Sequence, residues 1–401
     1  MKEPVYRRTY RAGVIGHTGR GNYGHGVGTA FAALPGVEVV AVADPDEAGR
    51  AKVIQQNGAL RGYANYREML EREQLDLVAV GPRWLDQHEA MMVAAAEAGA
   101  KAIYVEKPLA RSLDEADRIL AACDARGVKV AVSHQDRVTA PAHLAKDLLA
   151  QGKIGRLRVM RAYGKQDRRG GGQDLLVLGT RLLDLMRFYA GNAGQGQAGD
   201  VRWCHARVTQ DGHDATPADV RPADEEGAWI AGNNILAQYG FDDGVTGTFE
   251  SVRSDDGGGT DYFRIELCGT AGILTLWSIP GPDVYFYPRP YILPQYPHDW
   301  VVLHPEPLPW PALPAGDRPA MLARDRPADR PAGTHQFHRE NQWLVKDLLA
   351  AVEEDRPSIS SGHDGRAALE MIVAVYASHI QDSRVPLPLA RRTHPLASWA
   401  T

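Results

Sequence analysis

The sequence predicts an α/β protein, in which an N-terminal doubly wound parallel sheet precedes a C-terminal α+β domain with a large, mostly antiparallel sheet. Two observations support this fold class. Between residues 11 and 135, short apolar runs without polar alternation take turns with helical patterns, as expected for strands covered on both faces. After about residue 135, apolar and polar residues alternate between Gly and Asp turns, which is typical of half-buried antiparallel strands. We therefore expect one domain at 1–135 and a second at 136–401.

The parallel sheet is predicted from five apolar runs, at residues 12–16, 37–44, 75–81, 101–107 and 128–134. Helical patterns lie between them at residues 66–73, 88–99 and 112–127. The last of these helices is expected to open on a capping box, formed by Ser112 with Glu115 three residues later. It is expected to close on Gly127 at the C′ position.

The second domain is predicted to begin with an amphipathic helix at residues 140–152. Alternating strands are expected at residues 156–164, 233–241, 245–252 and 262–269, and two helical patterns at residues 340–354 and 363–380 close the chain. Residues 305–334 are rich in Pro, Ala, Arg and Asp and contain "DRP" three times. We expect this segment to be an irregular arm rather than a repeat domain.

Composition disfavours several classes of function. The 401 residues, 44% hydrophobic and 24% charged, are enough for two domains with separate cores. A net charge of −5 without a long basic run argues against a nucleic-acid partner or an anionic membrane surface. No stretch approaches the roughly 20 apolar residues of a membrane span, and no apolar region of an export signal follows Arg7 and Arg8. Because Cys123, Cys204 and Cys268 show no metal-type spacing, we expect reduced thiols in a soluble, cytoplasmic protein.

A glycine-rich loop, "GHTGRGNYGHG" at residues 16–26, follows the first predicted strand. The pattern G-x-G-x-x-G fits it either literally at Gly19, Gly21 and Gly24, or from Gly16 to Gly21 with Thr18 in the middle position. The second frame is favoured because the motif begins where the strand ends. A little over 20 residues beyond the loop, Asp44 ends the second strand, where a carboxylate can bind a ribose diol and repel a 2′-phosphate. The segment thus predicts a Rossmann-type dinucleotide site that prefers NAD to NADP.

A second feature is the sequence "YVEKPL" at residues 104–109, in which an apolar strand ends on Glu106, Lys107 and Pro108. Together with the glycine loop and Asp44, this segment resembles the Gfo/Idh/MocA oxidoreductases, the glucose–fructose oxidoreductase and inositol dehydrogenase group. The resemblance extends over nearly the whole chain, through "VEKPLA" (105–110), "GKIGRLRV" (152–159), "LGTRLLDLMRFYAG" (178–191) and the closing segment 362–389.

The resemblance implies a nicotinamide bound in a cleft between the domains, with the substrate on the face of the second domain's sheet. Lys107 would reach the nicotinamide ribose and the reacting hydroxyl, Glu106 would hold the cofactor end of the site, and Pro108 would set the turn. A cationic nicotinamide nearby would lower the pKa of Lys107 below its usual value of about 10.4, towards proton transfer. The alternative is that Lys107 is an ordinary solvated lysine at the end of a strand.

The residues expected to hold the cofactor share a position at the ends of the predicted parallel strands. They are Gly16, His17, Thr18, Gly19, Arg20, Gly21, Asn22, Asp44, Arg83, Trp84, His88, Glu106, Lys107 and Gln135. The stretch before His88 is longer than in the family, so Arg83 and Trp84 are either additional cofactor contacts or ordinary loop residues.

The sequence departs from the family in the second domain, where relatives carry Gly-x-His-x-x-Asp. Here Gly179 and Asp184 are retained, but Arg181 stands at the histidine position. Arginine stays protonated and has no lone pair, so it cannot act as general base. Three interpretations remain open: Arg181 polarises substrate while Lys107 is the sole acid/base, which we favour; Arg181 holds the carboxylate or phosphate of an acidic sugar; or Arg181 and Asp184 form a structural ion pair and the chemistry is reduced.

The polar loop at residues 164–174 is expected to contribute substrate contacts, unless it is a mobile surface loop. The candidates are Lys165, Arg168, Gln173 and Asp174, in addition to Arg181. No metal is expected, since no third ligand accompanies His335 and His338.

The predicted function is NAD-dependent oxidation or reduction at a secondary hydroxyl or ketone of a sugar, glycoside or cyclitol. The alternatives are a redox-neutral glycosidase that retains its NAD, and a ligand-sensing regulatory protein without catalysis. A homo-oligomer, dimer or tetramer, is implied by the resemblance.

Overall fold

The computed structural model describes residues 9–191, 199–224, 227–255, 262–278, 283–290, 300–305 and 337–399. The chain divides into two compact units. The first comprises Met1–Val138, Glu225–Ala228 and Pro307–Arg366, and the second comprises Thr139–Asp224, Trp229–Glu306 and Ala367–Thr401. The expected division near residue 135 lies close to the first boundary, but the helix after residue 337 belongs to the first unit instead of the second. Almost all of the predicted Pro-rich arm lies outside the described residues.

The first unit contains a sheet of six parallel strands in the order β3-β2-β1-β4-β5-β6, which confirms the predicted fold class. These strands are β1 (Tyr10–Ile15), β2 (Val37–Ala43), β3 (Arg61–Tyr63), β4 (Leu77–Val80), β5 (Ala102–Val105) and β6 (Lys129–Val132). The order reverses between β1 and β4, and ligands of such sheets bind outside the carboxyl ends of the strands at this reversal. The glycine loop follows β1 at that edge.

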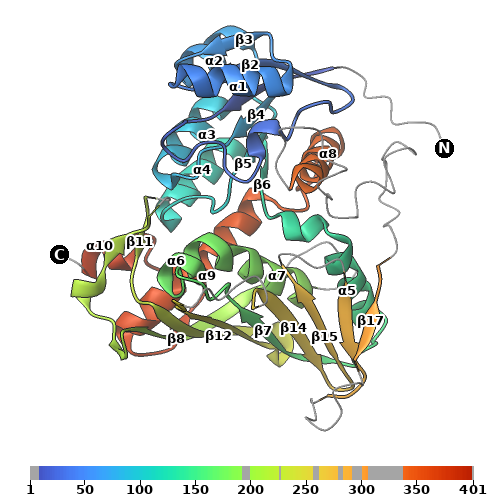
Figure 1. Cartoon of the computed structure of the whole chain (residues 1–401), viewed down its shortest axis with the longest axis vertical. Helices are drawn as coiled ribbons and strands as arrows, with labels where there is room; N and C mark the ends of the chain where they lie inside the picture. The colour runs from blue at the N-terminus through green and yellow to red at the C-terminus, as the bar shows by residue number, and fades with distance from the viewer. Residues whose placement is uncertain are drawn as a thin grey trace. The chain divides into compact units, whose positions relative to one another are not determined.

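Helices α1 (Glu47–Asn57), α2 (Tyr66–Glu73), α3 (His88–Glu97) and α4 (Leu113–Asp124) connect these strands. A fifth helix, α8 (His338–Glu354), comes from much later in the chain and packs against β5 and β6 (Figure 1). Its residue Asn341 is fully buried, so the helix forms part of the core of this unit.

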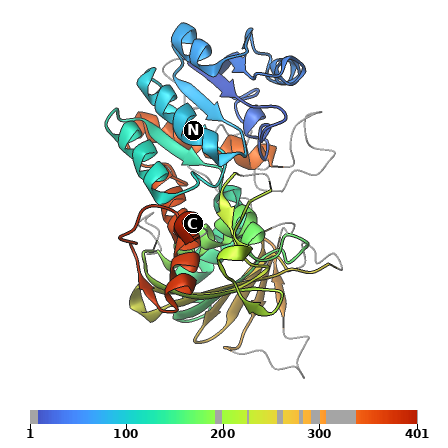
Figure 2. The ribbon, with the colours of Figure 1, turned by 90° about the vertical axis from the view of Figure 1, so that its left-hand side faces the viewer.

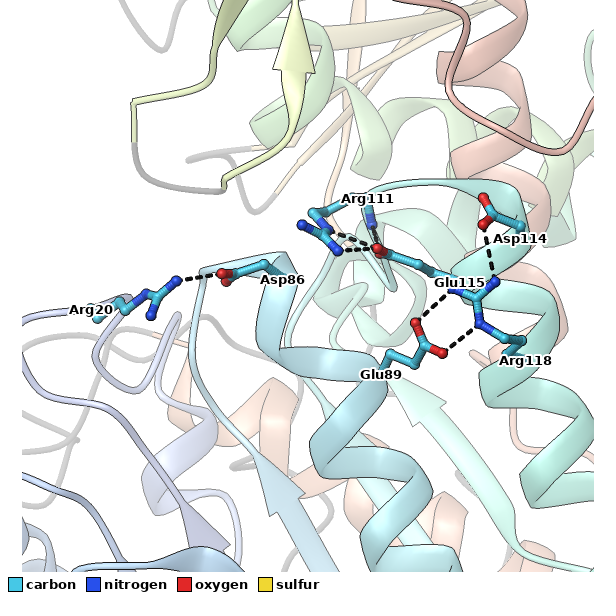
Figure 3. Close-up of polar contacts among 7 residues, drawn as sticks. All are labelled: Arg20, Asp86, Glu89, Arg111, Asp114, Glu115 and Arg118. Carbon is cyan, nitrogen blue, oxygen red and sulfur yellow. Dashed lines mark hydrogen bonds and ion pairs between the residues drawn. The ribbon is translucent and has the colours of Figure 1, made fainter. Parts of the chain in front are cut away.

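The segment after the glycine loop forms only a 3₁₀ turn, Val27–Thr29, and Gly24 and Gly26 just before it adopt positive φ angles of 49° and 83°. One local prediction in this unit is wrong. At the start of α4, the Ser112 side chain makes no capping hydrogen bond. Glu115 pairs instead with Arg111, whose Nε donates to it over 2.8 Å (Figure 3).

The second unit contains a ten-stranded sheet among the described residues, with its main path in the order β17-β16-β15-β14-β7-β13-β12-β8-β18 and β9 paired with β8. Its strands are β7 (Leu157–Tyr163), β8 (Val201–Gln210), β9 (His213–Asp214), β12 (Asn234–Phe241), β13 (Thr246–Val252), β14 (Arg264–Gly269), β15 (Ile273–Trp277), β16 (Val284–Tyr287), β17 (Val301–Leu303) and β18 (Val385–Pro386). A separate two-stranded ribbon pairs β10 (Arg221–Pro222) with β11 (Trp229–Ile230). Every pairing in the large sheet is antiparallel except that of β13 with β7. The predicted, mostly antiparallel sheet is therefore confirmed.

The helices of this unit are α5 (Ala140–Ala150), α6 (Gly172–Asp174), α7 (Thr180–Ala190), α9 (Gly362–Gln381), which begins in the first unit, and α10 (Pro395–Trp399). A π-helical turn, Leu175–Gly179, joins α6 to α7. Helices α7 and α9 cover one face of the sheet (Figure 1 and Figure 2). Tyr239 on β12 donates its hydroxyl to Met371 O of α9 over 3.2 Å, and Gly179 lies against Phe249 of β13. Among the described residues, no helix has the length and apolar character needed to cross a membrane.

Candidate active site

The glycine loop turns sharply at the carboxyl end of β1. Gly19 and Gly21 have φ angles of 83° and 89°, which side-chain-bearing residues rarely adopt. A Cβ on Gly21 would lie 2.6 Å from the backbone nitrogens of both Arg83 and Trp84. The loop therefore lies directly on the segment that follows β4, and glycine is required there by close approach as well as by conformation.

Asp44, at the end of β2, is fully buried and its carboxylate faces the loop. Both carboxylate oxygens accept the Thr18 backbone N–H at 3.1 Å, one also accepts the Thr18 hydroxyl at 2.7 Å, and the other the Asp46 N–H at 2.9 Å. Gly49 leaves room for the Thr18 side chain, since a Cβ there would lie 1.9 Å from its hydroxyl oxygen. A carboxylate beside a glycine turn at this edge fits the adenosine ribose of a dinucleotide. The Thr18 hydroxyl, however, occupies an acceptor position that a ribose hydroxyl would need.

Several predicted cofactor residues hold the loop in place. His17 Nδ1 lies 2.5 Å from Gln87 Oε1, and the Asn22 side chain accepts the Gly19 N–H at 3.1 Å. Arg20 pairs with Asp86 on the segment after β4 (Figure 3).

The aromatic ring after β4 and the following histidine have different surroundings. The guanidinium carbon of Arg20 lies 5.1 Å from the centre of the Trp84 ring, and both Trp84 and Arg83 are partly exposed. His88 is fully buried, with Nε2 2.7 Å from Pro82 O and Nδ1 3.0 Å from Leu109 O. His88 thus connects two loops through its ring nitrogens, which is a supporting position.

Lys107 lies in the loop that begins where β5 ends. Its side chain is only 2% exposed, which excludes the alternative of a solvated strand-end lysine. The Lys107–Pro108 peptide bond is cis, and the Lys107 backbone N–H donates to Ser133 Oγ over 3.0 Å. This hydrogen bond anchors the backbone of Lys107 at the carboxyl edge of the parallel sheet.

Glu106 is fully buried beside Lys107. Its Oε1 lies 2.6 Å from His25 Nδ1 and 3.7 Å from Lys107 Nζ. Its Oε2 accepts the Ser133 hydroxyl at 3.1 Å and the His25 N–H at 3.3 Å. Burial alone would raise the pKa of Glu106, but His25 and Lys107 outweigh that effect and lower the pKa below its usual range. The group is consequently a carboxylate at neutral pH.

Asn341 of α8 connects this cluster to the rest of the unit. Its Oδ1 accepts the Tyr104 hydroxyl at 2.7 Å and Gln135 Nε2 at 2.9 Å, and its Nδ2 donates to His25 O over 2.9 Å. The amide nitrogen of Gln135, a predicted cofactor residue, is therefore directed at α8. Sequence reasoning missed His25, Ser133 and Asn341; the position of His25 within the glycine loop was the one available signal.

In the second unit, the residues predicted to bind substrate lie along the continuous helix from α6 to α7 and in the loop before it. Arg181 and Asp184 are both buried, one turn apart on α7. The π-helical turn just before them is a form that often occurs at functional sites. An ion pair between Arg181 and Asp184 stays a prediction.

The glycine run that precedes α6 is packed against neighbouring backbone. A Cβ on Gly170 would lie 2.2 Å from the backbone of Arg253, and one on Gly171 2.5 Å from that of Asn233. The alternative of a mobile surface loop is not supported for this part of the segment.

Within the same segment, Lys165 pairs with Asp167 at 3.4 Å, and Gln173 Oε1 accepts the Asp224 N–H at 3.1 Å. Arg168 is exposed. Burial raises the pKa of Asp167, but hydrogen bonds and charge from Arg169 outweigh it and lower the pKa to about 2.

Asp174 is the most deeply buried of these side chains. Its Oδ2 accepts the Ser251 hydroxyl at 2.6 Å and the Gln166 N–H at 3.3 Å, whereas its Oδ1 has no hydrogen-bond partner among the described residues. Burial raises the pKa of Asp174 above its usual range. The Asp174 carboxyl group therefore keeps its proton to a higher pH than an exposed aspartate does.

Comparison with known proteins agrees with this geometry. Over 257 residues, the chain is 27% identical to levoglucosan dehydrogenase from Pseudarthrobacter phenanthrenivorans, an alignment that covers 60% of this chain and 64% of that protein. It is 35% identical to inositol 2-dehydrogenase 3 from Saccharopolyspora erythraea over 148 residues, or 37% of this chain and 42% of that one. The chain thus spans less than two thirds of these curated relatives.

A solved structure shows the same fold over almost the entire chain. It is an NAD binding oxidoreductase from Klebsiella pneumoniae, 22% identical, which superposes with a TM-score of 0.69 and covers 95% of this chain and 100% of that one. Residues 10–134 match the model of the oxidoreductase family GFO_IDH_MocA, described by its NAD-binding Rossmann fold. The resemblance drawn from the sequence is confirmed as a similarity: residues 10–134 match the Gfo/Idh/MocA oxidoreductase family with its NAD-binding Rossmann fold.

Proposed function

We propose that this protein is an NAD-dependent oxidoreductase that acts on a secondary hydroxyl or ketone of a sugar, glycoside or cyclitol, with Lys107 as the acid/base. The observation that carries the proposal is the burial of Lys107 beside the carboxylate of Glu106, at the carboxyl edge of an NAD-binding sheet. The names of the relatives, levoglucosan dehydrogenase and inositol 2-dehydrogenase, support the substrate class.

The chemistry divides into a hydride and a proton. When bound, the nicotinamide supplies the hydride acceptor for the carbinol carbon of the substrate. The neutral amine of Lys107 takes the hydroxyl proton and becomes an ammonium group, and in the reverse direction it returns that proton to the ketone oxygen. Asp44 favours NAD over NADP, since its buried carboxylate would repel a 2′-phosphate.

On the second unit, Arg181 is proposed to bind and polarise the substrate, because a guanidinium can donate hydrogen bonds but cannot accept the proton. Asp184, Lys165, Arg168, Gln173 and Asp174 are proposed as further substrate contacts. A carboxylate or phosphate on the substrate would add a bidentate partner for Arg181. We also propose that the protein acts as a homo-oligomer, a dimer or tetramer, which light scattering coupled to size-exclusion chromatography would test.

The test is the absorbance of reduced nicotinamide with NAD and a panel of sugars, uronic acids and cyclitols. General acid/base catalysis contributes about 10²- to 10⁴-fold, so Lys107→Ala should lower kcat/KM by at least the lower figure. The matched control is Lys101→Ala, which removes a lysine paired with Asp76 just before the amino end of β5 and should leave the rate unchanged. Selective loss of acidic substrates in Arg181→Ala would identify a carboxylate clamp.

Other outcomes would contradict the proposal. Glycoside cleavage without net reduced nicotinamide, by protein that releases NAD on denaturation, would identify a redox-neutral glycosidase. Ligand binding with neither activity would identify a sensor.

A further inference from the structure

The three groups around Glu106 do not share its carboxylate equally. His25 Nδ1 reaches Oε1 at 2.6 Å, within hydrogen-bond distance, whereas Lys107 Nζ lies 3.7 Å from the same oxygen. The second oxygen is occupied by the hydroxyl of Ser133 and the backbone N–H of His25. The strongest contact of the carboxylate is therefore with a histidine that the proposed chemistry does not use.

This distribution affects the proton affinity of Lys107. A nearby carboxylate stabilises the ammonium form and raises the pKa of a lysine, which makes it a poorer base at neutral pH. A hydrogen bond from His25, and its positive charge when protonated, reduce the attraction that Glu106 exerts on Lys107. The imidazole and the amine thus compete for one anion.

We propose that His25 is a positioning residue that adjusts the basicity of Lys107 by holding the Glu106 carboxylate. The inference rests on the proposed role of Lys107 as the acid/base and deepens it. The proposed role gives His25 no contact with substrate or reacting atoms. His25 acts only through Glu106.

Neighbouring residues fix the position of His25 beside Glu106. A Cβ on Gly24 would lie 2.7 Å from the carboxyl group of Glu106, so glycine is needed for the loop to come this close. Asn341 Nδ2 donates to His25 O over 2.9 Å, and Phe337 lies with its ring centre 6.2 Å from that of His25. Both ends of the histidine are thereby fixed, its backbone by α8 and its ring by Glu106.

Within the described part of the chain, the elements packed against this cluster carry a few further titratable groups. His134 and Asp136 follow β6, and His338 and Glu340 begin α8; all four are buried. Burial and the charge of Arg339 lower the pKa of His338 to about 4, so this histidine is neutral near pH 7. Arg137, beside Asp136, pairs with Asp364 at 3.2 Å.

The first measurement is the titration of Lys107 in the protein without added cofactor or substrate. Selectively ¹³C-labelled lysine would be followed by NMR against pH, with the Lys107 signal identified by its loss in Lys107→Arg. In His25→Gln the midpoint should rise by about one pH unit, a tenfold gain in proton affinity. In Glu106→Gln the midpoint should move the opposite way, because the anion itself is gone.

The second measurement is the pH profile of kcat/KM in the same variants. The acidic limb of the profile should move to higher pH in His25→Gln and to lower pH in Glu106→Gln. A merely structural role would reduce the rate without moving the limb. The matched control is His363→Gln, which removes an exposed histidine paired with Asp124 at 3.2 Å and should leave both measurements unchanged.

Three results separate the possibilities. If the Lys107 midpoint stays fixed or falls in His25→Gln, the inference is overturned, whatever the activity. If Lys107→Ala retains full turnover, the proposed function fails, while the titration still decides whether His25 controls Lys107. Opposite shifts in the two variants, together with loss of turnover in Lys107→Ala, would establish both.

Discussion

Glu106 in the first unit and Asp174 in the second are two buried carboxyl groups in closely similar settings. A glycine lies against each carboxyl group. A Cβ on Gly24 would be 2.7 Å from Glu106, and one on Gly164 would be 2.2 Å from Asp174. Each accepts a serine hydroxyl, from Ser133 at 3.1 Å and from Ser251 at 2.6 Å. In both cases the same serine oxygen accepts a backbone N–H at 3.0 Å.

The two groups nevertheless have opposite pKa shifts. Burial raises the pKa of both, but for Glu106 the neighbouring His25 and Lys107 outweigh burial and the net pKa is lowered. For Asp174 the nearby charges of Asp167 and Arg169 act in opposite directions, and burial dominates. The hydrogen bonds common to both sites therefore do not decide the direction in which the pKa of a buried carboxyl group shifts, whereas an adjacent cation does.

Of the two buried carboxyl groups, Glu106 should show the largest effect on the free energy of unfolding when its charge is removed. Glu106→Gln leaves His25 and Lys107 without their buried counter-charge, so the free energy of unfolding at pH 7 should fall by about 3 kcal/mol. Urea denaturation would measure it. The control is Glu89→Gln, which breaks a surface ion pair with Arg118 (Figure 3) and should cost less than about 1 kcal/mol. Equal losses in the two variants would contradict the comparison.

The next largest effect concerns the two serines that donate hydrogen bonds to these carboxyl groups. Ser133 donates to a carboxylate whose pKa is lowered, and Ser251 to a carboxyl group whose pKa burial raises. Hydrogen bonds to charged groups are the stronger kind. Ser133→Ala should therefore cost about 2 kcal/mol of unfolding free energy, and Ser251→Ala about 1 kcal/mol. Both serines are fully buried, so the substitutions are matched. A larger loss for Ser251→Ala than for Ser133→Ala would contradict this order.

The effect of Asp174→Asn on the free energy of unfolding should depend on pH. Because the folded-state pKa of Asp174 is raised above its ordinary 3.8, its stabilising contribution is full at low pH and is lost as pH rises through the folded pKa. Asp174→Asn should accordingly gain stability relative to the unsubstituted protein as pH rises from about 4 towards neutrality. For Glu106 the sign is reversed, since its lowered pKa stabilises the fold above 4.5 and that contribution is lost as pH falls. Thermal unfolding from about pH 2 to pH 8 would show opposite slopes, that of Asp174 above its ordinary 3.8 and that of Glu106 below its ordinary 4.5. Parallel slopes would refute the distinction.

The smallest effect concerns a third buried carboxylate, Asp44, whose partners are neutral donors. Thr18→Ala removes the hydroxyl that competes for Asp44, so NAD should bind about two- to tenfold more tightly, the equivalent of one neutral hydrogen bond. Isothermal titration calorimetry would measure the Kd. Weaker binding would show that the Thr18 contact orders the loop for the cofactor instead of competing with it.

Much of the first unit could be predicted from the sequence because its strands are continuous apolar runs, and the predicted runs at 37–44 and 128–134 correspond to β2 and β6. Helix α1 was missed although it has clear end signals. Asp46 caps its first turn by accepting the Gly49 N–H at 2.6 Å, and Gly58 ends it with a positive φ. The capping-box prediction failed at Glu115 because Arg111, one helical turn earlier in the sequence, supplies a charged partner that the capping pattern does not consider.

The candidate site could be predicted only where its residues sit in recognisable motifs. Lys107 and Asp44 could be found at the ends of apolar runs, and their burial agrees with that position. Asn341 could not, because an asparagine within a helical pattern gives no sign of the strands it will contact. The π-helical turn before Arg181 is equally invisible, since its residues are ordinary helix-compatible leucine and valine with one glycine.

The contact of Gln135 with Asn341 joins residues 206 positions apart and has a consequence for biosynthesis. At about 5–20 residues per second, a ribosome needs roughly 10–40 s to reach Asn341 after completing the parallel sheet. During that interval the nascent glycine loop lacks its attachment to α8, while Thr139–Asp224 and Trp229–Glu306 of the second unit are being translated. The parallel-sheet unit is thus begun first but completed only after most of the second unit has been made, so its maturation depends on α8, whose Asn341 is translated 206 residues after Gln135.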